Sequence, residues 1–203
     1  MSATLAPVFF IGGTVSAELM AANFDPVVQT ISELAALDSP VRVFMSVMFV
    51  LTSLCHAVTA RFAIGIGLPG RIAIGVAAVS SLFVAIFPLP TMAGSSPEHR
   101  TAAIIGFIAL AVWPVLGMRR GEPHPWIIRP VGAILGTALM ATFCFSFLAV
   151  WASPQLGYVG VVERIAANTE SIWPALVLWS LFAAQRRATS SIDVTLPVNA
   201  PAL

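Results

Sequence analysis

The sequence predicts an all-α fold, a polytopic membrane helix bundle with six transmembrane helices. Hydrophobic residues make up 58% of the 203 residues, charged residues make up 9%, and the mean hydropathy is +0.93. Soluble domains carry about 25% charged residues, so this chain has too few charges to cover its surface in water. Its apolar residues gather in six runs, separated by short polar links, and each run is close to the roughly 20 residues that cross a bilayer core.

The first three runs have ends that the sequence marks. No basic stretch precedes the first run, so it is expected to be a retained helix and not a cleaved signal peptide. The second run follows Pro40, a residue that suits the first turn of a helix. The third run ends in residues 88–97, where three prolines, a glycine and two serines predict a turn.

The last three runs contain packing and kink signals. Gly132 and Gly136 let a neighbouring helix approach closely, while Pro114 and Pro174 are each expected to kink a helix. The expected helices cover residues 5–24, 41–62, 70–88, 99–118, 130–151 and 164–185. They form a single six-helix transmembrane domain, residues 1–185, followed by a polar cytoplasmic tail, residues 186–203.

The arginines predict the orientation. All ten basic residues other than histidine are arginines; seven fall on one side of the predicted bundle and three on the other. The seven are Arg61, Arg71, Arg119, Arg120, Arg129, Arg186 and Arg187; the three are Arg42, Arg100 and Arg164. Because cytoplasmic loops carry the excess of arginine, we expect both termini in the cytoplasm and a multi-pass protein of the cell (inner) membrane.

Two carboxylates lie inside predicted helices. Glu18 lies within the first helix, and Glu170 lies roughly 9 Å into the sixth. Ionisable groups at such depth are costly and are functional candidates, although a structural hydrogen bond is an equal alternative for Glu18. We expect Glu18 to face the interior with a polar partner from the sixth helix or the first link. We also expect Arg164 or His99 to lie close to Glu170 or Glu33.

The remaining candidates lie at the outward ends of the helices. Ser32 and Glu33 belong to residues 29–40, which predict a short amphipathic or re-entrant helix. His99 beside carboxylates suits a general base or a metal ligand, but also a simple structural hydrogen bond. Arg164 suits an anionic headgroup. The candidate ligand-binding residues are Glu18, Ser32, Glu33, His99, Glu163, Arg164 and Glu170.

Several chemical signatures are missing from the sequence. It has no phosphate-binding glycine loop, nucleophile elbow, His-x-x-x-His pair or cysteine pair, so we expect no cofactor and no metal site. Cys55 and Cys144 lie in apolar runs and are expected to be small buried side chains. His56 is expected to serve packing. The net charge of +1 excludes a polybasic nucleic-acid binder.

An ordered set of motifs resembles a known membrane family. The motifs are Ile31-Ser32-Glu33-Leu34-Ala35 with Ser39-Pro40, Ile86-Phe87-Pro88 with His99, and Gly160-x-x-Glu163-Arg164-Ile165 with Trp173. On a six-helix frame they resemble the bacterial and archaeal family called domain of unknown function 998, over nearly the whole chain. This chain differs in having Pro97-Glu98 before the histidine and a longer tail. The resemblance implies the fold but no activity. A fainter similarity to eukaryotic lipid-remodelling and autophagy-modulator membrane proteins favours lipid as the partner.

Three functions fit these observations. The first is an outward polar mouth that binds a lipid headgroup or small amphiphile, with membrane lipids as partners. The second is a membrane-embedded enzyme of the lipid hydrolase or remodelling type that uses His99 and carboxylates. The third is a structural subunit or assembly partner in an oligomer or larger complex. An enzyme would need His99 and Glu18 or Glu33 within hydrogen-bond reach of one pocket.

Overall fold

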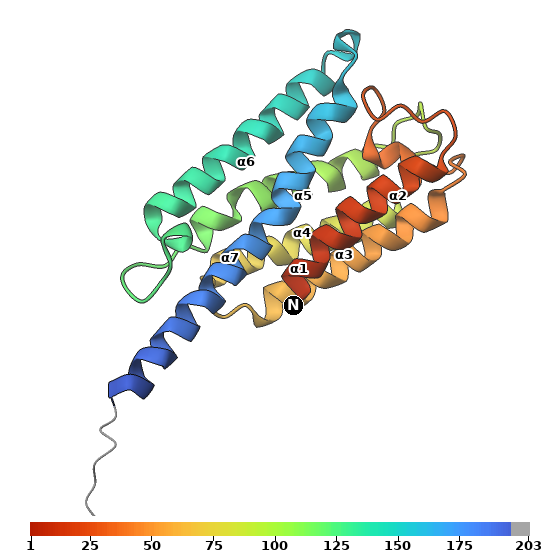
Figure 1. Cartoon of the computed structure of the whole chain (residues 1–203). Helices are drawn as coiled ribbons and strands as arrows, with labels where there is room; N and C mark the ends of the chain where they lie inside the picture. Colours follow the sequence, from red (N-terminus) through yellow and green to blue (C-terminus); the bar gives the residue numbers. More distant parts are fainter. Residues whose placement is uncertain (196–203) are drawn as a thin grey trace, which may run out of the picture.

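The computed structural model describes residues 1–195, apart from the side chains of Pro154 and residues 190–195, so residues 196–203 of the expected tail lie outside it. Every regular element in the described part is a helix (Figure 1). The elements are α1 (Ser2–Pro7), η1 (Val8–Gly12), α2 (Gly13–Met20), η2 (Ile31–Ala35), α3 (Arg42–Phe62), α4 (Leu68–Ile86), α5 (Pro97–Leu116), η3 (Trp126–Ile128), α6 (Pro130–Trp151), η4 (Pro154–Leu156) and α7 (Val159–Thr195).

The long helices form a closed ring in chain order. The rod made by α1, η1 and α2 packs against α3, each later long helix packs against the next, and α7 returns to pack against α1 (Figure 1). The links of residues 21–41, 87–96 and 152–158 lie together at one end, which we call the mouth end. The N-terminus lies toward the opposite end, where α7 extends beyond the ring (Figure 1). The ring encloses the interior in which the cavities described below lie.

Within residues 1–195, five helices are long and apolar enough to cross a membrane. They are Ser2–Met20, Arg42–Phe62, Leu68–Ile86, Pro97–Leu116 and Pro130–Trp151. In the most apolar 18-residue stretch of each of these helices, at most 39% of the residues are buried inside the protein, so most of them keep some exposed surface. The chain is therefore an all-helical, multi-pass membrane protein. α7 is the sixth long helix but is not one of the five by composition.

The predicted boundaries agree with the helices to different degrees. α6 spans the predicted residues, whereas α4 and α5 each begin and end two residues before their predicted bounds. The first predicted helix, 5–24, is wrong at its end: the chain leaves the helix at Ala21 and takes φ 66° at Asn23. The sixth, 164–185, is too short, because α7 begins at Val159 and no glycine or proline interrupts residues 175–195.

Glycines allow close contacts in the ring. Gly136 meets another long helix as expected, whereas Gly132 lies against the backbone of Trp126 and Ile127 in η3, directly before α6. A Cβ atom on Gly136 of α6 would collide with the indole of Trp173 on α7. A Cβ atom on Gly70 of α4 would collide with the backbone of Gly117, just after α5. Pro114 and Pro174 both lie inside helices, as predicted. These contacts hold the ring closed around its interior.

Candidate functional site

Arg164 joins three segments at the mouth end. Its Nε donates to Oε1 of Glu18 at 2.8 Å, and its Nη2 lies 2.7 Å from the same oxygen. Its Nη1 donates to the backbone carbonyls of Gln29 at 2.8 Å and Gly160 at 2.9 Å. The guanidinium also lies 5.7 Å from the centroid of the Phe24 ring, within range for a cation–π contact. Arg164 therefore fastens α2 and the first link to the start of α7.

The Arg164 contacts decide two expectations. Glu18 was expected to have a polar partner from the last helix, and the ion pair with Arg164 confirms this. In the described part of the chain, Arg164 forms its ion pair with Glu18 and not with Glu170 or Glu33. The same expectation also allowed His99, and His99 and Glu33 line one cavity, which is described below. The positive charge of Arg164 is therefore neutralised by Glu18 within the protein.

Two carboxylates at the mouth end accept hydrogen bonds from the backbone. Oε2 of Glu163 accepts from the amide of Ile31 at 2.5 Å, and the Glu163 side chain is buried. Oε1 of Glu33 accepts from the amide and hydroxyl of Thr30 at 2.9 and 3.0 Å, which completes a capping box around η2. Oε2 of Glu33 accepts from Nε2 of Gln29 at 3.0 Å. These carboxylates shape the first link.

His99 has one ring nitrogen fixed and one without a partner. It lies in the first turn of α5, where its amide donates to Oγ of Ser96 at 3.2 Å. Its Nδ1 lies 2.9 Å from the carbonyl oxygen of Phe87, and because a carbonyl only accepts, we assign the proton to Nδ1. Nε2 is then an acceptor, and it is buried without a hydrogen-bond partner among the described residues.

A cavity of about 420 Å³ opens at the mouth end, and we call it the mouth cavity. Four of the seven candidate residues line it: Ser32, Glu33, His99 and Glu163. Arg100 also lines it, exposed, with its guanidinium 5.8 Å from the centroid of the Trp151 ring. Apolar side chains from α5 and α6 complete the wall. The mouth cavity therefore combines one exposed cation with polar and apolar surfaces.

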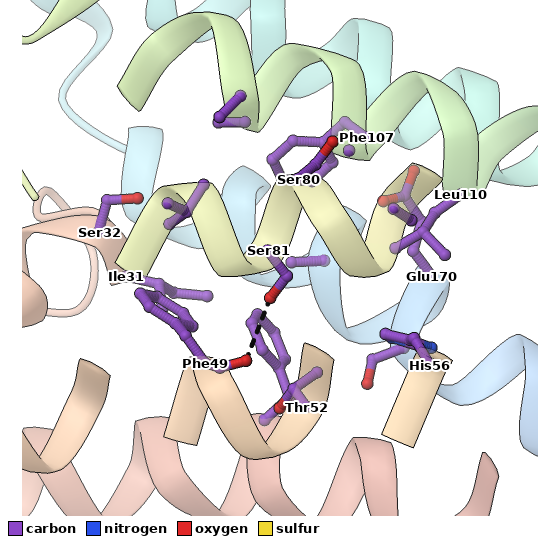
Figure 2. A pocket seen from close by; sticks show the side chains of 18 of the residues that line it. Ile31, Ser32, Phe49, Thr52, His56, Ser80, Ser81, Phe107, Leu110 and Glu170 are labelled. Carbon is purple, nitrogen blue, oxygen red and sulfur yellow. Dashed lines mark hydrogen bonds between the residues drawn. The ribbon is translucent and has the colours of Figure 1, made fainter. Parts of the chain in front are cut away.

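A second cavity of about 110 Å³ adjoins the first, and we call it the inner cavity. The two cavities share Ser32, Ala103, Phe107 and Glu163 as lining residues. Figure 2 shows Ser32 toward one end of the inner cavity and His56 and Glu170 toward the other. Glu170 is 1% exposed and His56 is 2% exposed. Glu170 Oε1 and His56 Nδ1 have no hydrogen-bond partner in the described part of the chain.

The seven candidates thus have three placements. Ser32 and Glu163 line both cavities, Glu33 and His99 line the mouth cavity alone, and Glu170 lines the inner cavity alone. Glu18 and Arg164 line neither cavity and instead fasten the helices together. Sequence reasoning missed His56 and Arg100. A signal for His56 was present, because Thr52, His56 and Thr59 repeat at helical spacing and all three are buried.

The described residues offer little for metal chemistry. Among residues 1–195, no three His, Cys, Asp or Glu side chains lie together in a way that would hold a metal ion. Cys55 and Cys144 are both buried, as expected, and neither is in a disulfide.

Comparison with family models identifies a family for most of the chain. The family model described as a protein of unknown function, DUF998, matches residues 4–180, which is most of the chain. No curated protein and no solved structure matches the chain.

Proposed function

Because the chain belongs to the DUF998 family of proteins of unknown function, we propose its function from geometry: it is a six-span protein of the inner membrane whose outward mouth cavity binds the phosphate headgroup of a lipid. Both termini are cytoplasmic in this proposal, and the mouth end faces out. The observation that most supports this proposal is the exposed, positively charged Arg100 on the wall of a cavity of about 420 Å³.

The closed ring supports a sixth span. α7 packs against α1 and α6, so it lies alongside helices that are apolar enough to cross the membrane. The charges that lower its hydropathy are partly neutralised within the protein, because Arg164 is paired with Glu18. An even number of spans returns the chain to its starting side, and the excess of arginine at the end opposite the mouth favours the cytoplasm there.

The charged groups on the wall of the mouth cavity favour an anionic ligand, because the carboxylates already have hydrogen-bond partners and the arginine has no carboxylate partner in the described part of the chain. The two carboxylates on the wall, Glu33 and Glu163, already accept backbone hydrogen bonds. Within the described residues the guanidinium of Arg100 has a cation–π contact with the ring of Trp151 and forms no ion pair with a carboxylate. A guanidinium binds a phosphate through two parallel hydrogen bonds, and Phe107 and Phe147 offer apolar surface for the start of an acyl chain.

Calorimetric titration of the full chain in neutral detergent tests this function. Dihexanoyl phosphatidylglycerol is expected to bind, and dihexanoylglycerol, which has the same acyl chains without the phosphate, is expected not to bind. Arg100→Gln should weaken binding about tenfold or more, because it removes a charge-assisted hydrogen bond. Arg42→Gln, at an exposed arginine of the same end that does not line the cavity, is the matched control. Equal binding of the two lipids would contradict the proposal.

A lipid hydrolase is the second candidate, and His99 is the observation that favours it. Its Nδ1 is oriented by the Phe87 carbonyl and its Nε2 keeps a lone pair, which is the arrangement of a general base that activates water. His99 and Glu33 line the same cavity. Fatty-acid or headgroup release from the same phosphatidylglycerol, lost in His99→Gln, would support hydrolysis. Binding without product formation would support the headgroup-binding function alone.

A further inference from the structure

The inner cavity is lined by a buried carboxylate and a buried imidazole, each with one polar atom that no described residue satisfies. Glu170 comes from α7 and His56 from α3, and both are almost completely buried. Glu170 Oε1 and His56 Nδ1 have no hydrogen-bond partner among the described residues. Leaving such a group unpaired in a buried site costs about 1–3 kcal/mol, and more for a charge. Two such groups lining one cavity indicate a site for a ligand.

Two hydroxyls on the wall of the inner cavity already donate to backbone carbonyls, whereas the buried hydroxyl of Ser171 has no hydrogen-bond partner among the described residues. The hydroxyl of Thr52 donates its proton to the carbonyl of Met48 at 2.8 Å, and that of Ser81 donates to the carbonyl of Phe49 at 3.3 Å. Their oxygens keep lone pairs free. None of the residues that line the inner cavity is an arginine, and the chain has no lysine. The inner cavity therefore lacks a fixed positive charge to balance Glu170.

The rest of the cavity wall is apolar and partly aromatic. Phe49, Phe107 and Leu110 line it (Figure 2), together with Ala77 and Val84. Aromatic faces attract cations when water is excluded. A volume of about 110 Å³ equals a few water molecules at roughly 30 Å³ each, which also suits a short alkyl chain with one polar end. The apolar wall distinguishes this cavity from a site for a hydrated ion.

We propose that the inner cavity binds a small organic cation, a protonated primary alkylamine. The ammonium group donates hydrogen bonds to Glu170 and to a ring nitrogen of His56, and its charge balances the carboxylate. The alkyl chain lies against Phe49 and Phe107. The ligand enters from the mouth cavity past the shared residues Ser32 and Glu163. This site is separate from lipid binding at Arg100, and neither proposal depends on the other.

The probe is butylammonium chloride, and the readout is the thermal unfolding midpoint (Tm) of the full chain in neutral detergent. A ligand that binds the folded state raises the Tm in a concentration-dependent way. Butylammonium is expected to raise it, whereas butanol and sodium chloride, at matched concentration and ionic strength, are not. A rise with butanol as large as with butylammonium would show a purely apolar cavity. An equal rise with sodium chloride would show an inorganic cation site. Either result, or no rise at all, overturns the proposal.

Single substitutions test whether the rise in Tm comes from binding in the inner cavity. Glu170→Gln should require about tenfold or more butylammonium for the same rise in Tm, because it removes a charge-assisted hydrogen bond. Glu98→Gln, an exposed glutamate that does not line the inner cavity, is the matched control and should respond like the unchanged protein. If Glu170→Gln does not fold, Ala77→Leu takes its place, because it keeps the carboxylate and fills the apolar wall. Ala77→Leu should abolish the rise in Tm; a retained rise would overturn the proposal.

Discussion

Arg164 on α7 and Glu18 on α2 form a largely buried ion pair between residues 146 positions apart in the chain. Their side chains are 15% and 18% exposed, and the same guanidinium donates to Gln29 and Gly160. This pair holds the last helix of the ring against the first. The pair also neutralises two charges that would otherwise be buried without a partner. The stability of the mouth end therefore depends on this ion pair.

The Arg164–Glu18 pair should be strongly coupled in a double-mutant cycle. With Glu18→Gln and Arg164→Gln, we expect a coupling energy of about 1–3 kcal/mol, since removing one partner leaves the other charge largely buried. Arg164→Gln should cost more alone, because it also loses the two carbonyl contacts. Unfolding in mixed micelles with dodecyl sulfate measures each free energy.

The chain contains a matched control for this cycle. Arg129 and Glu122 form an ion pair at the opposite end whose side chains are 35% and 77% exposed. Exposed pairs contribute about 0–1 kcal/mol, so the coupling energy of this pair should be small. Arg164→Gln and Glu170→Gln should be additive, because the two residues share no ion pair. Equal coupling in the two ion pairs would contradict the account of the ring closure.

Glu163→Ala should loosen the first link. It leaves the buried amide of Ile31 without an acceptor, at a cost of about 1–3 kcal/mol. Hydrogen exchange of residues 25–36 should accelerate more than that of α3. The control is Asp38→Ala, because Asp38 Oδ1 accepts from the amide of Met92 at 2.8 Å in an exposed position, where water can replace it. Unchanged exchange in Glu163→Ala would show that this hydrogen bond does not hold the link.

Cysteine labelling tests the orientation. In a background with Cys55→Ala and Cys144→Ala, single cysteines at Ser95 and Gln155 should react with an impermeant maleimide added outside intact cells. Cysteines at Arg120 and Ala188 should react only after the membrane is opened. All four positions are exposed, so reactivity reports the side of the membrane and not burial. The reverse pattern would place the mouth end in the cytoplasm.

The contact between α4 and the end of α5 should not accept a methyl group. Gly70→Ala places a Cβ atom against the backbone of Gly117 and should destabilise the protein by about 1–3 kcal/mol. Gly12→Ala is the matched control, since outside the adjacent backbone of its own helix no atom lies within 4 Å of the added Cβ. It should be neutral or stabilising by up to about 1 kcal/mol. A harmless Gly70→Ala would mean that the two helices are not in close contact.

Helix positions could be predicted from the sequence where composition changes sharply. α6 was predicted residue for residue, because Pro130 marks its first turn and an uninterrupted apolar run follows. α7 was predicted too short at both ends. Its polar final turns resemble a tail in composition, yet nothing in residues 175–195 breaks a helix. The composition of a helix predicts whether it lies in lipid or in water, whereas glycine and proline predict where the helix ends.

The candidate site could be predicted only as a set of residues at one end. Topology brought Ser32, Glu33, His99 and Glu163 to one cavity, as expected. The sequence left the partner of Arg164 open among three carboxylates, because that choice depends on how α2 packs against α7. His56 was assigned to packing, because its helical spacing with Thr52 and Thr59 indicates a polar helix face but not the cavity beside that face.

Photo-crosslinking with a headgroup-labelled lipid tests the central claim most directly. The full chain is reconstituted in vesicles with a phosphatidylglycerol that carries a photoreactive group on its headgroup, and crosslinked peptides are mapped by mass spectrometry. We predict that crosslinks concentrate in residues 92–100 and 148–159, two segments that contribute residues to the wall of the mouth cavity. The crosslinks should fall about tenfold in Arg100→Gln but not in Arg42→Gln. Crosslinks confined to residues 119–129 at the opposite end, or unchanged in Arg100→Gln, would contradict headgroup binding in the mouth cavity.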